Sequence, residues 1–136
     1  MVNAVTRQDV LDDHWNARTR VHEYGGAAAT LYDGTLYFSH FGDNRVYMKT
    51  KGSDVVSPIT PGSFGQLLSQ FTTKVAHGRL ACLVQPTHRY ADFTVHPVHT
   101  NLLVGICEDH TDPHPARIVS TLALINSSTG TVKTLV

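Results

Sequence analysis

Residues 27–40 read AAATLYDGTLYFSH, two short apolar runs joined by Tyr32-Asp33-Gly34. An Asp-Gly pair between such runs is a strong signal for a two-residue β-hairpin turn, because both central residues of that turn need a positive φ. The sequence therefore predicts an antiparallel pair of strands over residues 27–31 and 35–40.

Two more short runs follow the hairpin. Residues 45–50, RVYMKT, alternate along the chain as in a half-buried strand. Residues 54–60, DVVSPIT, contain Pro58, which has no backbone N–H to donate and so indicates an edge strand. Together the runs predict a four-stranded antiparallel unit over residues 18–60.

The same pattern of four short runs separated by turns returns near the end of the chain, in RYADFTVHP, NLLVGICED, RIVSTLALIN and TVKTLV. NLLVGICED, residues 101–109, is almost continuously apolar, which predicts a strand buried on both faces. Repeated four-stranded units of ~40–45 residues are typical of β-propeller blades. We therefore expect an all-β fold of about two four-stranded antiparallel blades, 18–60 and 90–136, in an incomplete propeller ring. Two blades cannot close a ring, so we expect a fragment of a larger propeller.

Residues 61–89 interrupt this repeat. Ser63 and Gln66 have the spacing of a helical capping box, whereas RLACLVQ, residues 79–85, also suits a strand. A connection of this length between strands is unusual. We interpret it as an insertion or linker between the blades, with an unspliced segment as the alternative.

The composition excludes several classes of protein. The 136 residues include 11 basic and 11 acidic side chains, so no net charge attracts nucleic acid or an anionic membrane surface. Cys82 and Cys107 both lie in apolar runs, which indicates reduced thiols rather than a disulfide. The first residues lack the pattern of a secretory signal, and no run is long enough to span a membrane. We expect a cytoplasmic protein.

Four motifs carry a family resemblance: Arg20 to Gly26, Tyr37-Phe38-Ser39, Arg89 to Asp92 and Glu108-Asp109-His110. In this order the chain resembles the N-terminal β-propeller of the prolyl oligopeptidase family, in its dipeptidyl aminopeptidase and acylaminoacyl-peptidase-like branch. The resemblance covers nearly the whole chain except residues 61–88.

The resemblance implies serine peptidases in which a propeller gates access to an α/β-hydrolase domain. That domain carries a Gly-x-Ser-x-Gly elbow with later Asp and His residues. This sequence has no such elbow, since in PGSFG Gly62 directly precedes Ser63. We therefore expect no catalytic residue, metal or cofactor in this chain. The implied partners are the remaining blades, the hydrolase domain and a peptide substrate, and not nucleic acid or a membrane.

The run before the first hairpin supplies the candidate site residues. Glu23 and Arg20, beside Arg18, are candidates for holding a charged end of the substrate. We favour a structural role for this run, in which two glycines let the chain turn tightly into the first strand, and substrate contact is the alternative. The residues assigned to this structural motif are His22, Tyr24, Gly25, Gly26, Arg89, Tyr90 and Asp92.

Two other groups are interpreted as structural. The cluster Cys107, Asp109, His110, Asp112 and His114 has metal-like composition, but its spacing fits a polar hairpin loop better than a zinc site. The single Trp15 is expected to pack rather than to bind a ligand.

Two functions compete with the peptidase propeller. One is a stand-alone propeller-like protein-binding module that uses exposed sheet edges or the inserted loop. The other is a non-functional truncated product. Monomeric behaviour with cooperative unfolding favours the module, and aggregation favours truncation.

Overall fold

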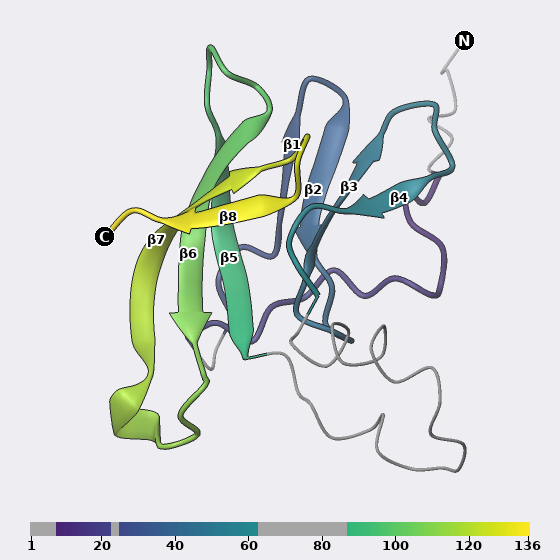
Figure 1. The fold of residues 1–136 in the computed structure, drawn as a ribbon. Helices are drawn as coiled ribbons and strands as arrows, with labels where there is room; N and C mark the ends of the chain where they lie inside the picture. Colours follow the sequence, from purple (N-terminus) through teal and green to yellow (C-terminus); the bar gives the residue numbers. More distant parts are fainter. Residues whose placement is uncertain (1–7, 23–24, 63–86) are drawn as a thin grey trace, which may run out of the picture.

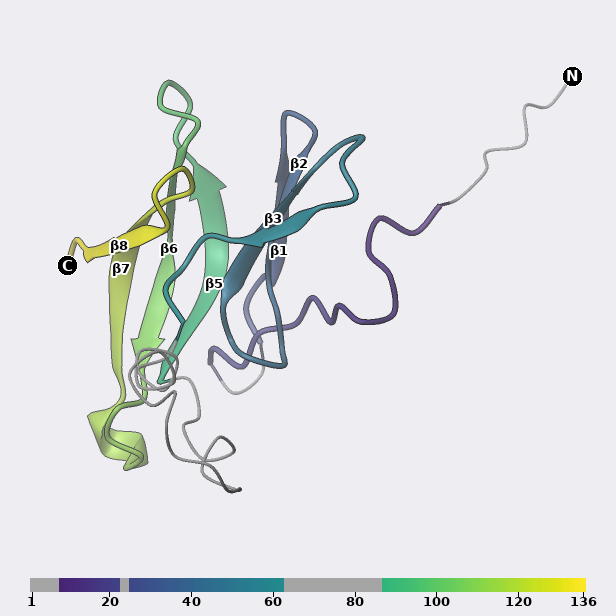
Figure 2. The ribbon, with the colours of Figure 1, turned by 45° about the vertical axis from the view of Figure 1, so that its right-hand side comes forward.

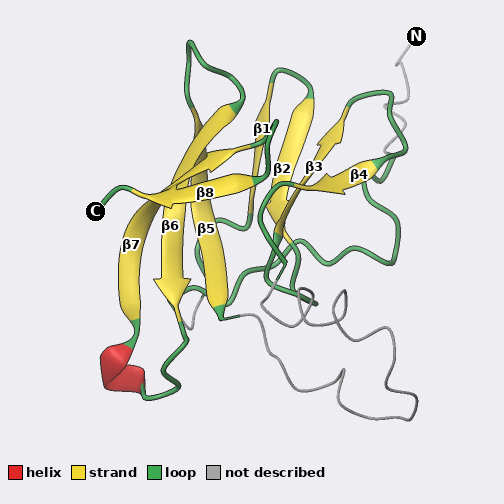
Figure 3. Ribbon diagram, viewed as in Figure 1, coloured by secondary structure: helices red, strands yellow, loops and turns green. Residues whose placement is uncertain are grey.

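The computed structural model describes residues 8–22, 25–62 and 87–136, which form two four-stranded antiparallel sheets (Figures 1 and 3). In each sheet the strands lie side by side in chain order. The first sheet contains β1 (Ala29–Tyr32), β2 (Thr35–Ser39), β3 (Val46–Thr50) and β4 (Val56–Pro58). The second contains β5 (His88–Val95), β6 (Leu102–Asp109), β7 (Val119–Asn126) and β8 (Thr131–Thr134), with a short 3₁₀ turn η1 (Pro115–Arg117) before β7. The expected all-β fold is confirmed, and the two sheets do not close into a ring.

The first hairpin forms as its turn residues predict. Asp33 has φ 44° and Gly34 has φ 71°, and Tyr32 pairs directly with Thr35. Two consecutive positive φ values match the twist of the flanking strands, which is why Asp-Gly is favoured there. Pro58 lies in β4, at the edge of the sheet, as predicted.

The two sheets share one hydrophobic core. Figure 2 shows β5 beside β1 and β2, so the second sheet packs against the first through its first strand. Leu103 of β6 and Ile125 of β7 are fully buried there. The first sheet contributes the buried side chains of Tyr37 and Val46, and Ile59, directly after β4, adds a third. Burying an aliphatic side chain of this size stabilises a fold by about 1.5–3 kcal/mol, so this shared core holds the sheets together.

The prediction that β6 is buried on both faces is wrong for the described residues. Leu103 and Cys107 face the core and are buried, whereas Val104 and Ile106 on the opposite face are only partly buried. The reason is that no described element covers this opposite face as the first sheet covers the core face. The second sheet therefore has one packed face and one partly open apolar face.

Several sequence predictions fall outside the described residues. These are the helix or strand expected between Ser63 and Gln85, and the burial of Cys82. The blade and insertion boundaries therefore stay predictions. The described residues contain no helix long and apolar enough to cross a membrane.

Candidate functional site

The candidate site is built by residues 17–22 and 25–27, here called the junction segment, which lie along the junction of the two sheets (Figure 1). Its anchor is the backbone carbonyl of Tyr90 in β5. The Thr19 hydroxyl donates a hydrogen bond of 2.8 Å to this oxygen, and the Ser39 hydroxyl of β2 donates one of 2.7 Å. One carbonyl oxygen thus joins the segment, the first sheet and the second sheet.

A second anchor joins Ala27 to Asp92. The Asp92 N–H donates to the Ala27 carbonyl at 2.9 Å, and the Ala27 N–H donates to the Asp92 carboxylate at 2.8 Å. Asp92 lies in an irregularity of β5, between Ala91 and Thr94, with φ 56°. Asp tolerates this left-handed conformation better than most residues, and the bulge directs its side chain at Ala27.

Gly26 is required by close approach rather than by its backbone angle. A β-carbon at this position would lie 2.7 Å from Asp92 Oδ2 and 2.9 Å from Ala91 Cβ. Gly25, by contrast, has φ 81°, and its N–H donates to the Val21 carbonyl at 3.1 Å to close a turn. The two glycines therefore serve different needs at the same turn.

A buried carboxylate completes the junction. Only 7% of the Glu108 side chain is exposed; its Oε1 accepts the His22 N–H at 2.8 Å, and its Oε2 lies 3.0 Å from His110 Nε2. His22 adopts φ 59° to make this contact. Burial alone raises the pKa of Glu108, but the hydrogen bonds with His110 and His22 outweigh it and hold the pKa below its ordinary value.

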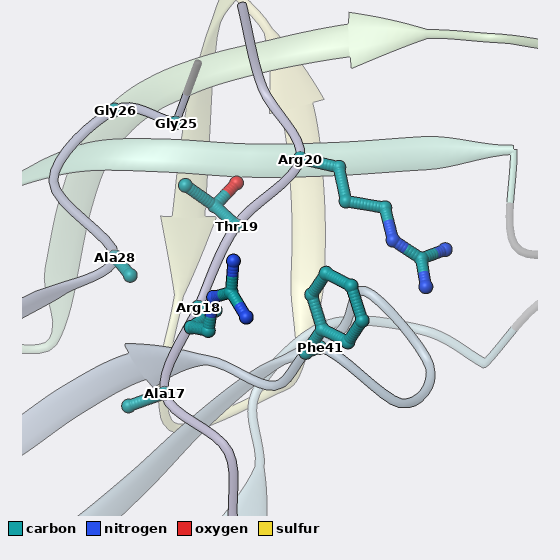
Figure 4. A pocket seen from close by; sticks show the side chains of 8 residues that line it. All are labelled: Ala17, Arg18, Thr19, Arg20, Gly25, Gly26, Ala28 and Phe41. Carbon is teal, nitrogen blue, oxygen red and sulfur yellow. The ribbon is translucent and has the colours of Figure 1, made fainter. Parts of the chain in front are cut away.

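An open hollow of about 560 Å³ lies beside the segment (Figure 4). Small residues leave the space: Ala17, Gly25, Gly26 and Ala28. The guanidinium carbons of Arg18 and Arg20 lie 5.1 and 4.0 Å from the centre of the Phe41 ring. The Phe41 N–H donates to the Asn16 carbonyl at 2.9 Å, which fixes the loop after β2 against the segment. The hollow is thus polar and cationic on one side and open to solvent.

The site residues predicted from the sequence divide into three groups. Glu23 and Tyr24 lie outside the described residues. Arg20 lines the hollow, while His22, Gly25, Gly26, Tyr90 and Asp92 make the junction contacts described above. Arg89 points its Nη1 at the Arg20 carbonyl, 3.4 Å away. Arg89 and Asp92 form no ion pair among the described contacts, and Asp92 is bound to Ala27 instead.

Sequence reasoning missed Glu108, Thr19 and Phe41 as parts of the site. Glu108 offered a signal, because a charged residue at the end of the apolar run NLLVGICED must be paired when it is buried. Thr19 and Phe41 offered none, since their partners lie far away in the sequence.

The residues read as structural behave as packing and loop residues. Trp15 packs on Tyr47 with ring centroids 4.8 Å apart and on Phe38 at 5.7 Å, as predicted. In the loop after β6, Asp112 accepts from Arg117 at 2.8 Å, and His114 caps η1. Within the described ranges, no three His, Cys, Asp or Glu side chains converge as metal ligands.

Removing the Asp92 side chain should loosen the junction. Asp92→Ala deletes the acceptor of the Ala27 N–H and places alanine at a positive φ, so we expect a loss of about 1–3 kcal/mol in the free energy of unfolding. Asp92→Asn keeps an acceptor oxygen and tolerates the same φ, so it is the matched control and should cost less than about 1 kcal/mol. Urea unfolding measures both, and equal stability of the two variants would contradict this role.

Replacing Glu108 should matter most at neutral pH. Because the folded pKa of Glu108 is lowered, its carboxylate stabilises the fold fully above the ordinary glutamate pKa of about 4.3, and this stabilisation is lost as the pH falls below that value and through the lowered folded pKa. Glu108→Gln should therefore destabilise the chain by about 1–3 kcal/mol at pH 7, and by progressively less as the pH falls below about 4. The exposed Asp54→Asn is the control for loss of one negative charge. A cost for Glu108→Gln that does not change with pH would refute the assignment.

No protein-family model matches the chain, and no curated protein matches it significantly. Solved structures do match the chain. A puromycin-hydrolysing peptidase from Mycobacterium tuberculosis matches with a TM-score of 0.68 and 26% identity, over 96% of this chain and 19% of that one. A puromycin hydrolase matches with a TM-score of 0.61 and 27% identity, over 92% of this chain and 18% of that one. The chain spans about a fifth of the length of each, and along nearly all of its own length it is similar to these peptidases of the prolyl oligopeptidase family, which confirms the resemblance seen in its sequence.

Proposed function

We propose that this chain is a non-catalytic β-propeller segment of a prolyl-oligopeptidase-family serine peptidase, of the dipeptidyl or acylaminoacyl peptidase-like kind. The observation that carries the proposal is the match of both sheets, over 96% of the chain, to about a fifth of a peptidase. The propeller gates access to an α/β-hydrolase domain that supplies the nucleophile, since this sequence has no Gly-x-Ser-x-Gly elbow. The proposed location is the cytoplasm.

The partly open face of the second sheet supports the proposal that further blades are partners. Val104 lies directly opposite Leu124, and Ile106 lies opposite Leu122. These cross-strand pairs form an apolar stripe, and 43% of Leu122 is exposed. In a propeller each such face is covered by the next blade, as the inner face of this sheet is covered by the first.

The substrate assignment follows from the same family. The two similar structures are named as proteins that hydrolyse puromycin, an aminoacyl amide, and we propose that the parent enzyme cleaves an amide bond next to an amino-terminal or blocked residue. Arg20 and Glu23 are proposed to contact a charged end of that substrate. The position of Arg20 at the open hollow supports its part in this role.

The test of the peptidase assignment is to sequence the DNA and transcript on both sides of this chain and to express the extended protein. We expect further blades and a downstream Gly-x-Ser-x-Gly elbow with later Asp and His. The extended protein should hydrolyse puromycin and aminoacyl p-nitroanilides, and replacement of the elbow serine by alanine should abolish both activities. The 136-residue chain alone should hydrolyse neither. Activity of the chain alone, or flanking DNA that encodes no hydrolase domain, would overturn the proposal.

The exposed stripe should make the isolated chain self-associate. Leu122→Lys places a charge in the stripe, so we expect sedimentation velocity to show oligomers for the unmodified chain and mainly monomers for the variant. Val98→Lys is the control, because Val98 is 76% exposed in the loop between β5 and β6, away from the stripe. A monomeric unmodified chain with cooperative thermal unfolding would instead favour the stand-alone binding module.

A further inference from the structure

Two arginines of the junction segment share one aromatic ring. Arg20 lies 4.0 Å and Arg18 5.1 Å from the centre of Phe41, measured from the guanidinium carbons. A guanidinium held over a ring keeps the N–H groups at its edge available for hydrogen bonds, because stacking uses its face. Figure 4 shows both side chains on the Phe41 side of the hollow.

A third arginine lies behind them. Arg89 of β5 donates from Nη1 to the Arg20 carbonyl at 3.4 Å, and its buried Nε has no hydrogen-bond partner among the described residues. Burial and the nearby charge of Arg20 both lower the pKa of Arg89, so the two cations repel each other. A buried donor without an acceptor is costly. Arg89 does not line the hollow itself, but it adds to the positive charge behind Arg20.

The described residues do not supply that group. No described carboxylate forms an ion pair with Arg18, Arg20 or Arg89, whereas Arg117 in the loop after β6 is paired with Asp112 at 2.8 Å. Glu108 is the cross-strand neighbour of Arg89, but its two oxygens are occupied by His22 and His110. In a chain with equal numbers of acidic and basic residues, the described side chains of this cluster therefore carry a local excess of positive charge.

We infer that the hollow beside Phe41 is a binding site for a carboxylate, and that its ligand is a short peptide with a C-terminal or side-chain carboxyl group. Arginine matches a planar carboxylate with paired N–H donors, and the small residues around the hollow leave about 560 Å³ of space. The inference rests on the proposed substrate contact of Arg20 and gives it a ligand class. Carboxylate binding at the hollow needs no hydrolase domain. A negative binding result would therefore leave the propeller assignment intact.

The test is a titration of the complete ¹⁵N-labelled chain, followed by NMR of its backbone and arginine Nε–H signals. The probes are N-acetyl-Gly-Gly, with a C-terminal carboxylate, and N-acetyl-Glu-amide, with a side-chain carboxylate. N-acetyl-Gly-Gly-amide, which has no carboxylate, and inorganic phosphate are the comparison ligands. We expect saturable shifts around Arg18, Arg20 and Phe41 with at least one carboxylate probe, and none with the amide. The carboxylate probe that binds more tightly shows whether the ligand's carboxylate is C-terminal or lies on a side chain.

The variants Arg18→Gln and Arg20→Gln should each weaken binding of that probe about tenfold, because each removes a charge-assisted contact. Arg117→Gln is the matched control and should leave the affinity unchanged. Arg89 is partly buried, so its replacement can unfold the chain. The test therefore uses Arg18 and Arg20, and an unchanged backbone amide spectrum shows that each variant is still folded.

Three results would overturn the inference. They are equal binding of the amide probe, tighter binding of phosphate than of either carboxylate, or affinities insensitive to both arginine substitutions. A fourth such result would come from Glu23→Gln. Binding of a carboxylate probe to this variant, but not to the unmodified chain, would mean that the Glu23 carboxylate occupies the hollow.

Discussion

The structure depends on one set of hydrogen bonds, which joins the junction segment to β5 through Thr19 and Ala27. The Tyr90 carbonyl accepts hydroxyl hydrogen bonds from Thr19 and Ser39, and Ala27 exchanges two hydrogen bonds with Asp92. Two antiparallel sheets have no backbone hydrogen bonds in common, so apolar contact alone would leave their relative position loosely defined. These directional contacts fix the register of one sheet against the other, and the core then packs around that register.

Fixing this register requires unfavourable local features. Asp92 and His22 both adopt positive φ values, and Gly26 leaves no space for a β-carbon. Glu108 is a buried charge, which stabilises a fold only when its hydrogen bonds are complete. A fold keeps such unfavourable features where the surrounding contacts compensate for them. The four residues named here all belong to the same junction. The junction is therefore where substitutions should have the largest effect for their size.

Most of the fold could be predicted from the sequence because its determinants are local. The Asp33-Gly34 turn sets a hairpin by its own φ values, and Pro58 marks an edge strand by lacking an N–H. The site could not be predicted to the same extent, because its partners are distant: Ala27 and Asp92 are 65 residues apart, and His22 and Glu108 are 86 apart. A motif such as HEYGG shows that a tight turn is present, but not which strand it turns against. The same limit explains the error over β6, since an apolar run does not reveal whether a layer covers its second face.

The junction also explains why positive charge gathers at one place. The hydrogen bond of Thr19 to Tyr90 holds the Thr19 side chain against β5. The residues on either side, Arg18 and Arg20, instead place their guanidinium groups over the ring of Phe41. Arg89, one residue before Tyr90, is brought to the Arg20 carbonyl by the same hydrogen bond. The contact that joins the sheets thus also sets where the three arginines lie, and a carboxylate bound by Arg18 and Arg20 in the hollow would stabilise the junction segment that carries them.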